Sequence, residues 1–426
     1  MPSMVPTGRK DAGKTFQFIN CRLIRGGKIV KDDLWVRDAK IINPEPVFFD
    51  EKIRANVVID CNDALICPGF IDVQINGGFG YDFSSDIANL QEAMSVVAKG
   101  ILATGVTSFC PTIVTSPASV YHQILPRIER TSGGPEGASI LGLHLEGPFI
   151  SPEKKGAHPL QFIRGFENGL KTVEEVYGRL DNVAMVTIAP ELPGATDVID
   201  GLVSRGIVVS AGHSSGNLDS GEAAVNCGAS FITHLFNAML PFHHRDPGLV
   251  GLLTSRHIKH PVHYGIIADG MHTHPAALRI AHRTHPKGLV LVTDAMAAMG
   301  LGEGEHTLGQ FQVTVQGKRA LLQGTETLAG SIVTMDECIR HFIHDAGVSI
   351  VEGIEAATLH PAQAMGIKHL KGTLDFGTDA DFVFLCDKGP LKVLHTFIAG
   401  ECVYSANDAH SLKPVHRNFS EEVMIK

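Results

Sequence analysis

Eight short runs of apolar and β-branched residues recur along the chain, and this repetition constrains the fold more than any other feature of the sequence. Most runs are separated by segments with the spacing of an amphipathic helix, such as residues 89–105, 171–181, 196–206 and 275–285. Strands that alternate with helices build parallel sheets, and eight such units predict an α/β fold of the (β/α)8 barrel type. A β-hairpin insertion is expected in residues 300–330, after the last run. The runs cover residues 65–73, 106–114, 140–147, 183–190, 206–213, 230–236, 262–270 and 288–295.

The two ends of the chain have a different pattern. Residues 16–42 and the segment after residue 370 alternate apolar and polar positions, as antiparallel strands do. We expect these ends to pair into one small β-sandwich domain beside the barrel. The predicted domains are residues 1–67 and 369–426 for the β-sandwich and residues 68–368 for the barrel.

Composition limits the classes of partner. The net charge of -9 gives no electrostatic reason to expect nucleic acid or an anionic membrane surface as a partner. A phosphorylated substrate remains compatible, because salt screens charges more than about 8 Å away, so a few local cations matter more than the net charge. The eight cysteines are scattered without a CxxC pair, and no run approaches the ~20 apolar residues of a membrane span. We expect a cytoplasmic protein with reduced thiols.

Polar side chains close several of the apolar runs. Glu146 ends the third run, His213 the fifth, His234 the sixth and Asp294 the eighth. In a parallel barrel the carboxyl ends of the strands meet at one rim, where active sites lie. One carboxylate and two imidazoles form a set that binds a catalytic zinc and leaves a fourth position open. The sequence therefore predicts one divalent ion per subunit, best matched by Zn²⁺, on Glu146, His213 and His234.

Each of these residues also has a structural interpretation. A single histidine at a strand end is most often a hydrogen-bonding residue, and the Gly-His-Ser at His213 could be a tight turn. Asp294 could cap a helix, since residues 295–300 follow it as AMAAMG. Glu146 is harder to explain in this way, because a carboxylate buried among apolar residues requires a cation or several donors. The coincidence of all four residues at strand ends favours a metal site.

Seven motifs carry a family resemblance: PGFIDVQINGG, HLEGPF, GHS, THLFNAM, ADGMH, VTDAM and TLAGS. The motifs occur in order between residues 68 and 331, and the resemblance runs from about residue 15 to the C-terminus. In this set the chain resembles the N-acetylglucosamine-6-phosphate deacetylase family of the amidohydrolase superfamily. The resemblance implies a metal-dependent enzyme that hydrolyses the acetamide of N-acetyl-D-glucosamine 6-phosphate to glucosamine 6-phosphate and acetate.

Gln74 and Asn76 end the first run, where binuclear relatives carry a His-x-His pair. Neutral amides are poor ligands for transition metals. The fourth run also ends at Glu191, without the lysine that bridges two metals in such relatives. We therefore expect one metal, with Gln74 and Asn76 as hydrogen-bonding or structural residues.

The end of the eighth run places Asp294 to take a proton from the attacking water and return it to the leaving amine. The resemblance implies roles for other residues. His158 would be a second catalytic residue, donating to the oxyanion and contacting the substrate. Arg245 would hold the phosphate, acting across the subunit interface of a homodimer. The implied substrate contacts are His158, Asn237, Ala238, Arg245, His272, Leu328, Ala329 and Gly330.

Two alternatives keep the same barrel. One is an amidohydrolase acting on another N-acyl or cyclic amide substrate, which would differ in its loops. The other is a non-catalytic amidohydrolase-like scaffold that has lost its metal. Arg245 and the FNAM loop (residues 236–239) favour a sugar phosphate over the first. Retention of Glu146, His213, His234 and Asp294 together speaks against the second.

Overall fold

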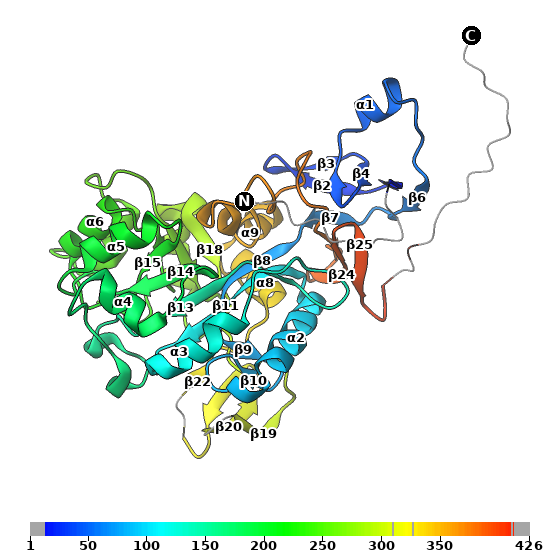
Figure 1. Cartoon of the computed structure of the whole chain (residues 1–426). Coiled ribbons are helices and arrows are strands. Elements are labelled where there is room, and N and C mark those ends of the chain that lie inside the picture. Colours follow the sequence, from blue (N-terminus) through cyan, green and yellow to red (C-terminus); the bar gives the residue numbers. More distant parts are fainter. Residues whose placement is uncertain (1–12, 309–310, 326–327, 410–411, 413–426) are drawn as a thin grey trace, which may run out of the picture.

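A ring of parallel strands forms the centre of the molecule (Figure 1). The computed structural model describes residues 13–308, 311–325, 328–409 and 412, so the outermost parts of the predicted 1–67 and 369–426 segments lie outside the described residues. Neighbouring barrel strands pair in parallel, in the order in which they occur in the chain. The strands are β8 (Phe70–Ile75), β11 (Val106–Val114), β13 (Leu143–Glu146), β14 (Val183–Ile188), β15 (Val208–Ala211), β16 (Phe231–Ile232), β17 (His263–Ile266) and β18 (Leu289–Leu291).

Backbone hydrogen bonds just beyond the last strand complete the ring. The Asp294 N–H donates to the Gln74 carbonyl at 2.9 Å, and the Asn76 N–H donates to the Ala295 carbonyl at 2.8 Å. The first and eighth strands therefore meet at their carboxyl ends. This arrangement confirms the predicted (β/α)8 barrel.

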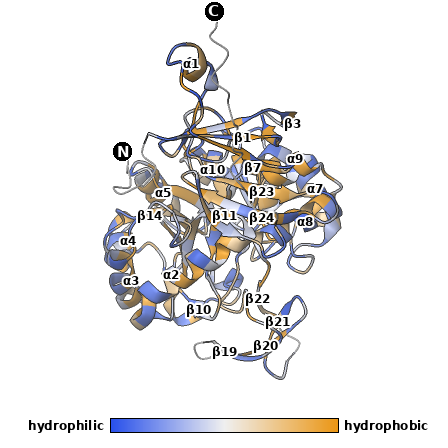
Figure 2. Ribbon diagram, turned by 90° about the vertical axis from the view of Figure 1, so that its right-hand side faces the viewer, coloured by the Kyte–Doolittle hydropathy of each residue, from blue (hydrophilic) through white to orange (hydrophobic). Residues whose placement is uncertain are grey.

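Helices cover the outside of the ring. The connection after β16 holds a 3-10 helix, Gly248–Leu253, in place of a full α-helix. In Figure 2 the strands are mostly hydrophobic, whereas the outer helices α3 and α4 carry hydrophilic stretches. This contrast is the amphipathic pattern expected of helices that bury one face against a sheet. The helices are α2 (Leu90–Gly100), α3 (Ala118–Ile124), α4 (Leu170–Tyr177), α5 (Ala195–Val203), α6 (Leu218–Asn226), α7 (Pro275–Thr284), α8 (Met335–Ala346), α9 (Ile350–Glu355) and α10 (Leu359–Ala364).

The first apolar run, residues 65–73, proves to be two strands in different sheets. Leu65–Pro68 forms β7 in the small β domain, and the chain enters the barrel only at Phe70. Gly69 lies between them, and a Cβ on it would come within 2.1 Å of the Thr107 side chain. The prediction of one continuous barrel strand was wrong, because a continuous apolar run does not show which sheet buries it.

Both ends of the chain contribute to the small β domain, as predicted. A four-stranded sheet has the order β5-β4-β1-β6, and a six-stranded sheet has the order β25-β24-β23-β7-β2-β3. A shared core includes Phe18 from the N-terminal part and Phe382 and Phe397 from the C-terminal part. The strands are β1 (Thr15–Ile19), β2 (Arg22–Arg25), β3 (Lys28–Lys31), β4 (Leu34–Arg37), β5 (Lys40–Ile41), β6 (Val57–Asp60), β23 (Phe382–Cys386), β24 (Lys392–Ile398) and β25 (Glu401–Ser405).

Two other elements differ from the sequence prediction. The short helix α1 (Pro44–Phe49) projects from the small β domain in Figure 1, where we expected only strands. Asn43 caps it by accepting a hydrogen bond from the Glu45 N–H. The insertion after β18 is also larger than one hairpin. It forms a four-stranded antiparallel sheet of β19 (Gly304–Leu308), β20 (Phe311–Gln316), β21 (Arg319–Leu322) and β22 (Leu328–Gly330).

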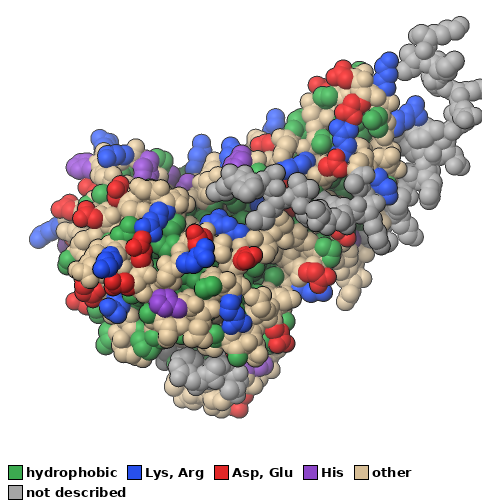
Figure 3. Space-filling model, viewed as in Figure 1, with side chains coloured by type: hydrophobic (Ala, Val, Ile, Leu, Met, Phe, Trp, Pro, Cys, Tyr) green, Lys and Arg blue, Asp and Glu red, His purple; other side chains and the backbone are tan. Residues whose placement is uncertain are grey.

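The exterior is mixed in character. Figure 3 shows acidic and basic side chains interspersed over one face of the molecule. Among the described residues, no helix has the length and hydrophobicity needed to cross a bilayer.

Candidate active site

Three side chains that are distant in sequence converge at the carboxyl ends of the barrel strands. Glu146 ends β13 and is 2% exposed. Its Oε1 lies 3.1 Å from His234 Nε2 and 3.4 Å from His213 Nε2. The two Nε2 atoms are 3.0 Å apart. The residues predicted as ligands therefore form one compact group, which we call the Glu-His-His set (Glu146, His213 and His234).

The backbone at this rim is unusual. His213, His234 and Asp294 have φ angles of 47°, 25° and 45°, and Phe236 and Ala238 in the FNAM loop are also positive. Side chains other than glycine rarely adopt this left-handed region, and each such residue costs about 1–3 kcal/mol. Such strain is found where the surrounding structure must aim a side chain in a particular direction. Here the strained conformation occurs at His213, His234 and Asp294, which were all predicted to close barrel strands.

The atoms of the Glu-His-His set fit a divalent cation. His213 Nδ1 donates to the Lys154 carbonyl at 2.8 Å, which leaves the Nε2 lone pair facing Glu146. Ligands placed about 2.0–2.2 Å from a tetrahedral ion are separated by roughly 3.3–3.6 Å, close to the distances seen here. A carboxylate with two imidazoles is also a donor set that zinc accepts. The residues present therefore fit the ion that the family implies.

The electrostatics of this group also favour a cation. Burial raises the pKa of Glu146, but the neighbouring imidazoles of His213 and His234 outweigh it and hold the pKa well below its usual range. Burial likewise lowers the pKa of His234, but the hydrogen bond and charge of Glu146 raise it to about 9. A positive charge beside Glu146 is thus strongly stabilised. At neutral pH that charge is the proton on His234. A bound metal ion would replace this proton, so metal binding should release it into solution.

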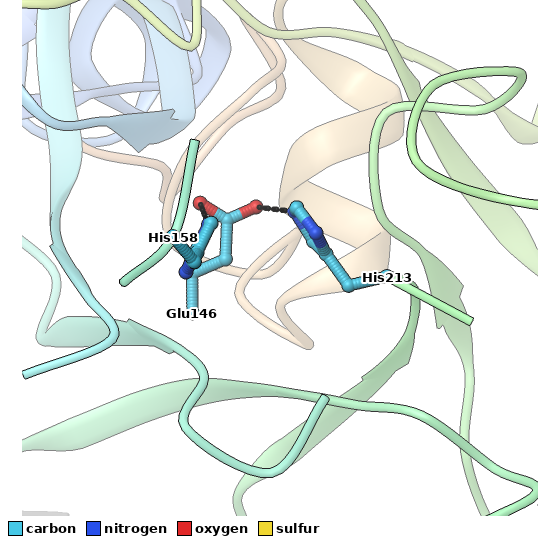
Figure 4. A group of neighbouring side chains, drawn as sticks. All are labelled: Glu146, His158 and His213. Carbon is cyan, nitrogen blue, oxygen red and sulfur yellow. Dashed lines mark ion pairs between the residues drawn. The ribbon is translucent and has the colours of Figure 1, made fainter. Parts of the chain in front are cut away.

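His158 lies on the other side of the same carboxylate. Its Nε2 is 3.9 Å from Glu146 Oε2, and Glu146, His158 and His213 offer ligand atoms within 4.8 Å of one another (Figure 4). The Thr115 N–H donates to His158 Nδ1 at 3.3 Å, so the neutral ring carries its proton on Nε2. Burial and the nearby His213 lower the pKa of His158 to about 3. His158 is therefore a neutral donor toward the site, whereas His213 presents a lone pair.

Gln74 and Asn76 hold the carboxylates of the site. Gln74 Nε2 donates to Glu146 Oε1 at 2.7 Å and lies 3.3 Å from Asp294 Oδ1. Asn76 Nδ2 donates to Asp294 Oδ1 at 2.7 Å. The carbonyl oxygens Gln74 Oε1 and Asn76 Oδ1 are buried with no hydrogen-bond partner in the described part of the chain. Buried acceptors of this kind suit a site that receives a further donor group.

Asp294 is half-buried at the centre of this network. Withdrawal from water and the charge of Glu146 raise the pKa of Asp294 to about 6, although His234 and Asn76 oppose the rise. A carboxyl group that titrates near neutral pH can both accept and return a proton. The position matches the general acid-base role expected for Asp294.

The residues expected to contact substrate fall into two groups. The Ser214 N–H donates to the Ala238 carbonyl at 3.0 Å, so Asn237 and Ala238 lie beside the His213 turn. His272 Nδ1 is 2.6 Å from Asp269 Oδ2, so this carboxylate orients the imidazole.

The second group lies further out. The Met296 N–H donates to the Ser331 carbonyl at 2.9 Å, which places Leu328, Ala329 and Gly330 of β22 near the segment after Asp294. Arg245 lies on an exposed turn, and its side chain forms no ion pair with another described residue. Over the ranges that the structure describes, no hydrogen bond or ion pair joins Arg245 to the Glu-His-His set, and its backbone N–H donates to His243 Nδ1 at 3.3 Å.

Sequence reasoning missed the partners that orient these side chains. Thr115 holds His158, Asp269 holds His272, and Glu191 contacts the turn after His213. Asp269 and Glu191 lie at or just beyond strand ends. The position at the end of an apolar run, which identified Asp294, could therefore have identified them as well. Nothing in the sequence indicates which histidine each would contact.

Comparisons with known proteins agree with this geometry. The model of the amidohydrolase family matches residues 65–403. N-acetylglucosamine-6-phosphate deacetylase of Danio rerio is 58% identical over 91% of this chain and 96% of its own length, and that of Homo sapiens is 57% identical over 93% and 97%. A solved variant of the Mycobacterium smegmatis N-acetyl-D-glucosamine-6-phosphate deacetylase, in complex with N-acetyl-D-glucosamine-6-phosphate, has a TM-score of 0.77 at 29% identity and covers 92% of this chain and 100% of its own. The chain therefore belongs to the amidohydrolase family, among the N-acetylglucosamine-6-phosphate deacetylases.

Proposed function

We propose that this protein is a metal-dependent deacetylase that hydrolyses the acetamide of N-acetyl-D-glucosamine 6-phosphate, releasing acetate and glucosamine 6-phosphate. The observation that carries the proposal is the convergence of Glu146, His213 and His234 within 3.4 Å of one another, beside Asp294. Relatives with this activity match along nearly the whole chain. A scaffold without catalysis would have no reason to keep this buried set.

Glu146, His213 and His234 would hold one divalent ion, which we propose to be Zn²⁺. When bound, such an ion supplies Lewis-acid chemistry, lowering the pKa of water toward ~7 and polarising a carbonyl oxygen. His213 is already oriented for this role by the Lys154 carbonyl. Gln74 restrains Glu146 through its side-chain amide.

Asp294 carries the proton transfers in this proposal. Its ionised carboxylate accepts a proton from the water that attacks the acetamide carbon. The protonated carboxyl then returns that proton to the amine nitrogen, so the amine leaves as a neutral group. Asn76 fixes the carboxylate for both steps by donating to Oδ1 at 2.7 Å.

His158 would stabilise the negative charge that develops on the acetamide oxygen. Its Nε2–H is free to donate because Nδ1 accepts from the Thr115 N–H. A low pKa keeps the ring neutral, so it contributes a hydrogen bond and no fixed charge.

The sugar phosphate would be held by the outer residues. We propose that His272, oriented by Asp269, contacts the sugar together with Asn237, Ala238, Leu328, Ala329 and Gly330. In support, Ala238 is hydrogen-bonded to the turn after His213, and Ser331, next to β22, is hydrogen-bonded to Met296. Arg245 supplies a forked cation suited to phosphate. Because Arg245 is exposed, we propose that it completes the site of the second subunit in a homodimer. The eight free thiols support a cytoplasmic location.

A direct test combines elemental analysis with an acetate-release assay. The purified protein should contain about one divalent ion per subunit and should release acetate from N-acetylglucosamine 6-phosphate faster than from the unphosphorylated sugar. Faster hydrolysis of the unphosphorylated sugar would refute the substrate assignment. Full activity after complete removal of metal by a chelator would refute the mechanism.

A further inference from the structure

Glu191, just after β14, makes an unusual concentration of contacts with the turn that follows His213. Its Oε2 accepts from the Ser214 hydroxyl at 2.6 Å. Its Oε1 accepts from the Ser215 N–H at 2.7 Å and from the Ser215 hydroxyl at 3.1 Å. Both carboxylate oxygens are therefore used by two consecutive residues. None of the proposed catalytic steps employs this carboxylate.

The turn held by Glu191 follows His213 and is hydrogen-bonded to the loop that follows His234. Ser214 directly follows His213, whose φ angle is 47°. The Ser214 N–H donates to the Ala238 carbonyl at 3.0 Å, which ties the turn to the FNAM loop after His234. A restraint on Ser214 is thus transmitted to the backbone of His213 and to the loop beside His234.

A second contact fixes the turn from the other side. The Ser151 N–H donates to the His213 carbonyl at 2.8 Å, and the Ser151 and Ser215 hydroxyls are 3.0 Å apart. The strained His213 backbone therefore lies between a backbone donor on Ser151 and the serines bound by Glu191. If the contacts of Glu191 with Ser214 and Ser215 were removed, the His213 backbone would be free to relax toward an unstrained φ.

We propose that Glu191 is a positioning residue that holds His213, and through it the Glu-His-His set, in the geometry that binds the metal. The inference rests on the metal site of the proposed function. Glu191 contacts neither the ion nor the substrate. Its carboxylate acts only through the His213 turn, in contrast to the bridging lysine that binuclear relatives place on this fourth strand.

Replacement by the isosteric amide should disturb the turn. Glutamine has one accepting oxygen, and its NH2 group would face either the Ser214 hydroxyl or the Ser215 N–H. Ser214 Oγ accepts from the Gly216 N–H at 2.9 Å and keeps a second lone pair, so a glutamine NH2 facing it would reverse the direction of this hydrogen bond. Glu191→Gln therefore reverses or breaks one contact and replaces charge-assisted hydrogen bonds with weaker neutral ones, without changing the volume of the side chain.

Gly216 offers an independent way to move the same carboxylate. A Cβ at Gly216 would lie 2.9 Å from Glu191 Oε2 and 3.0 Å from Ser214 Oγ. Gly216→Ala should displace Glu191 Oε2 and Ser214 Oγ, while Glu191 and the three proposed metal ligands keep their identity. The exposed Asp200 of α5 supplies a control, because Asp200→Asn removes one negative charge away from the turn.

The test is a Zn²⁺ titration of the metal-free full-length protein in competition with a chromophoric chelator. Glu191→Gln and Gly216→Ala should each weaken Zn²⁺ binding on the order of 10–100-fold, the usual effect of losing a group that orients a ligand. Asp200→Asn should match the parent. The melting temperature of the metal-free variants should stay near that of the parent, and kcat should recover when Zn²⁺ is saturating.

Zn²⁺ affinities within twofold of the parent for both variants would overturn the inference. Loss of cooperative melting in both metal-free variants would also overturn it, because Glu191 would then support the fold and not the site. Metal affinity is measured without substrate. A parent protein that binds Zn²⁺ but releases no acetate would therefore refute the proposed function and leave the role of Glu191 intact.

Discussion

Asn76 Nδ2 donates a hydrogen bond to Asp294 Oδ1 across 2.7 Å, joining the first and eighth strands of the barrel. The side chain that stands in place of a metal-binding histidine thus binds the proposed base. Gln74 makes a similar link from the same strand to Glu146. The Gln-x-Asn pair is therefore a set of amide donors that orients two carboxylates, which accounts for a metal site without the His-x-His pair.

Asp294→Asn should retain its metal and lose turnover. The amide cannot accept a proton from water, so kcat should fall by at least the ~10²- to 10⁴-fold typical of a general acid-base group. Acetate release and elemental analysis of the same preparation test both parts. Near-normal kcat would remove Asp294 from the mechanism.

His213→Ala and His234→Ala should each lose the metal, because two ligands cannot retain the ion against dilution. The control is His344→Ala, since the His344 side chain is 88% exposed. Metal content after gel filtration is the measurement. Full retention of zinc by either ligand variant would show that the ligand set is wrong.

Asn76→Ala should shift the acidic limb of the pH profile of kcat to higher pH. The hydrogen bond from Asn76 stabilises the ionised form of Asp294 and lowers its pKa, so losing this bond raises the pKa. Activity requires the ionised carboxylate and is lost as pH falls through that pKa. A limb that stays in place, or moves to lower pH, would contradict the assigned interaction.

Arg245→Ala should raise KM for the phosphorylated sugar by at least tenfold, about 1.4 kcal/mol of binding, with little change for the unphosphorylated sugar. Arg256→Ala removes another exposed arginine and serves as the control. Steady-state kinetics on both sugars separates a phosphate contact from a general loss of activity. Equal effects on the two sugars would argue against a phosphate contact.

Lys371→Met should destabilise the fold. The Lys371 side chain is 14% exposed and pairs with Asp381 and, at 3.1 Å, with Asp379. Asp379 would keep its ion pair with Lys40, but removing the cation leaves the buried Asp381 without its ion-pair partner, at a cost of about 3–5 kcal/mol. Chemical denaturation measures the loss, and Lys388→Met, at a side chain that is 77% exposed, should be nearly neutral.

Periodicity made the barrel predictable, because each strand and helix carries its own spacing of apolar residues. Strand-end position then identified Glu146, His213, His234 and Asp294, since parallel strands bring their carboxyl ends together. The limits of this reasoning appear at residues 65–73, where one apolar run serves two sheets.

The orienting contacts were beyond sequence reasoning for a physical reason. Thr115 and His158 are 43 positions apart, and Glu191 and Ser215 are 24 apart. Such pairings depend on side-chain directions that only the folded backbone fixes. The helix α1 was missed because its six residues are too few to show a helical period, although the cap at Asn43 and the following proline were visible.

The position of β7 has a consequence for how the protein is made. β7 lies between β2, translated early, and β23, which leaves the ribosome only after the whole barrel. Until then one edge of β7 has no pairing strand, and Phe18 lacks its cover from Phe382 and Phe397. A chain released before β23 would therefore keep an unpaired edge on β7 and an incomplete core around Phe18.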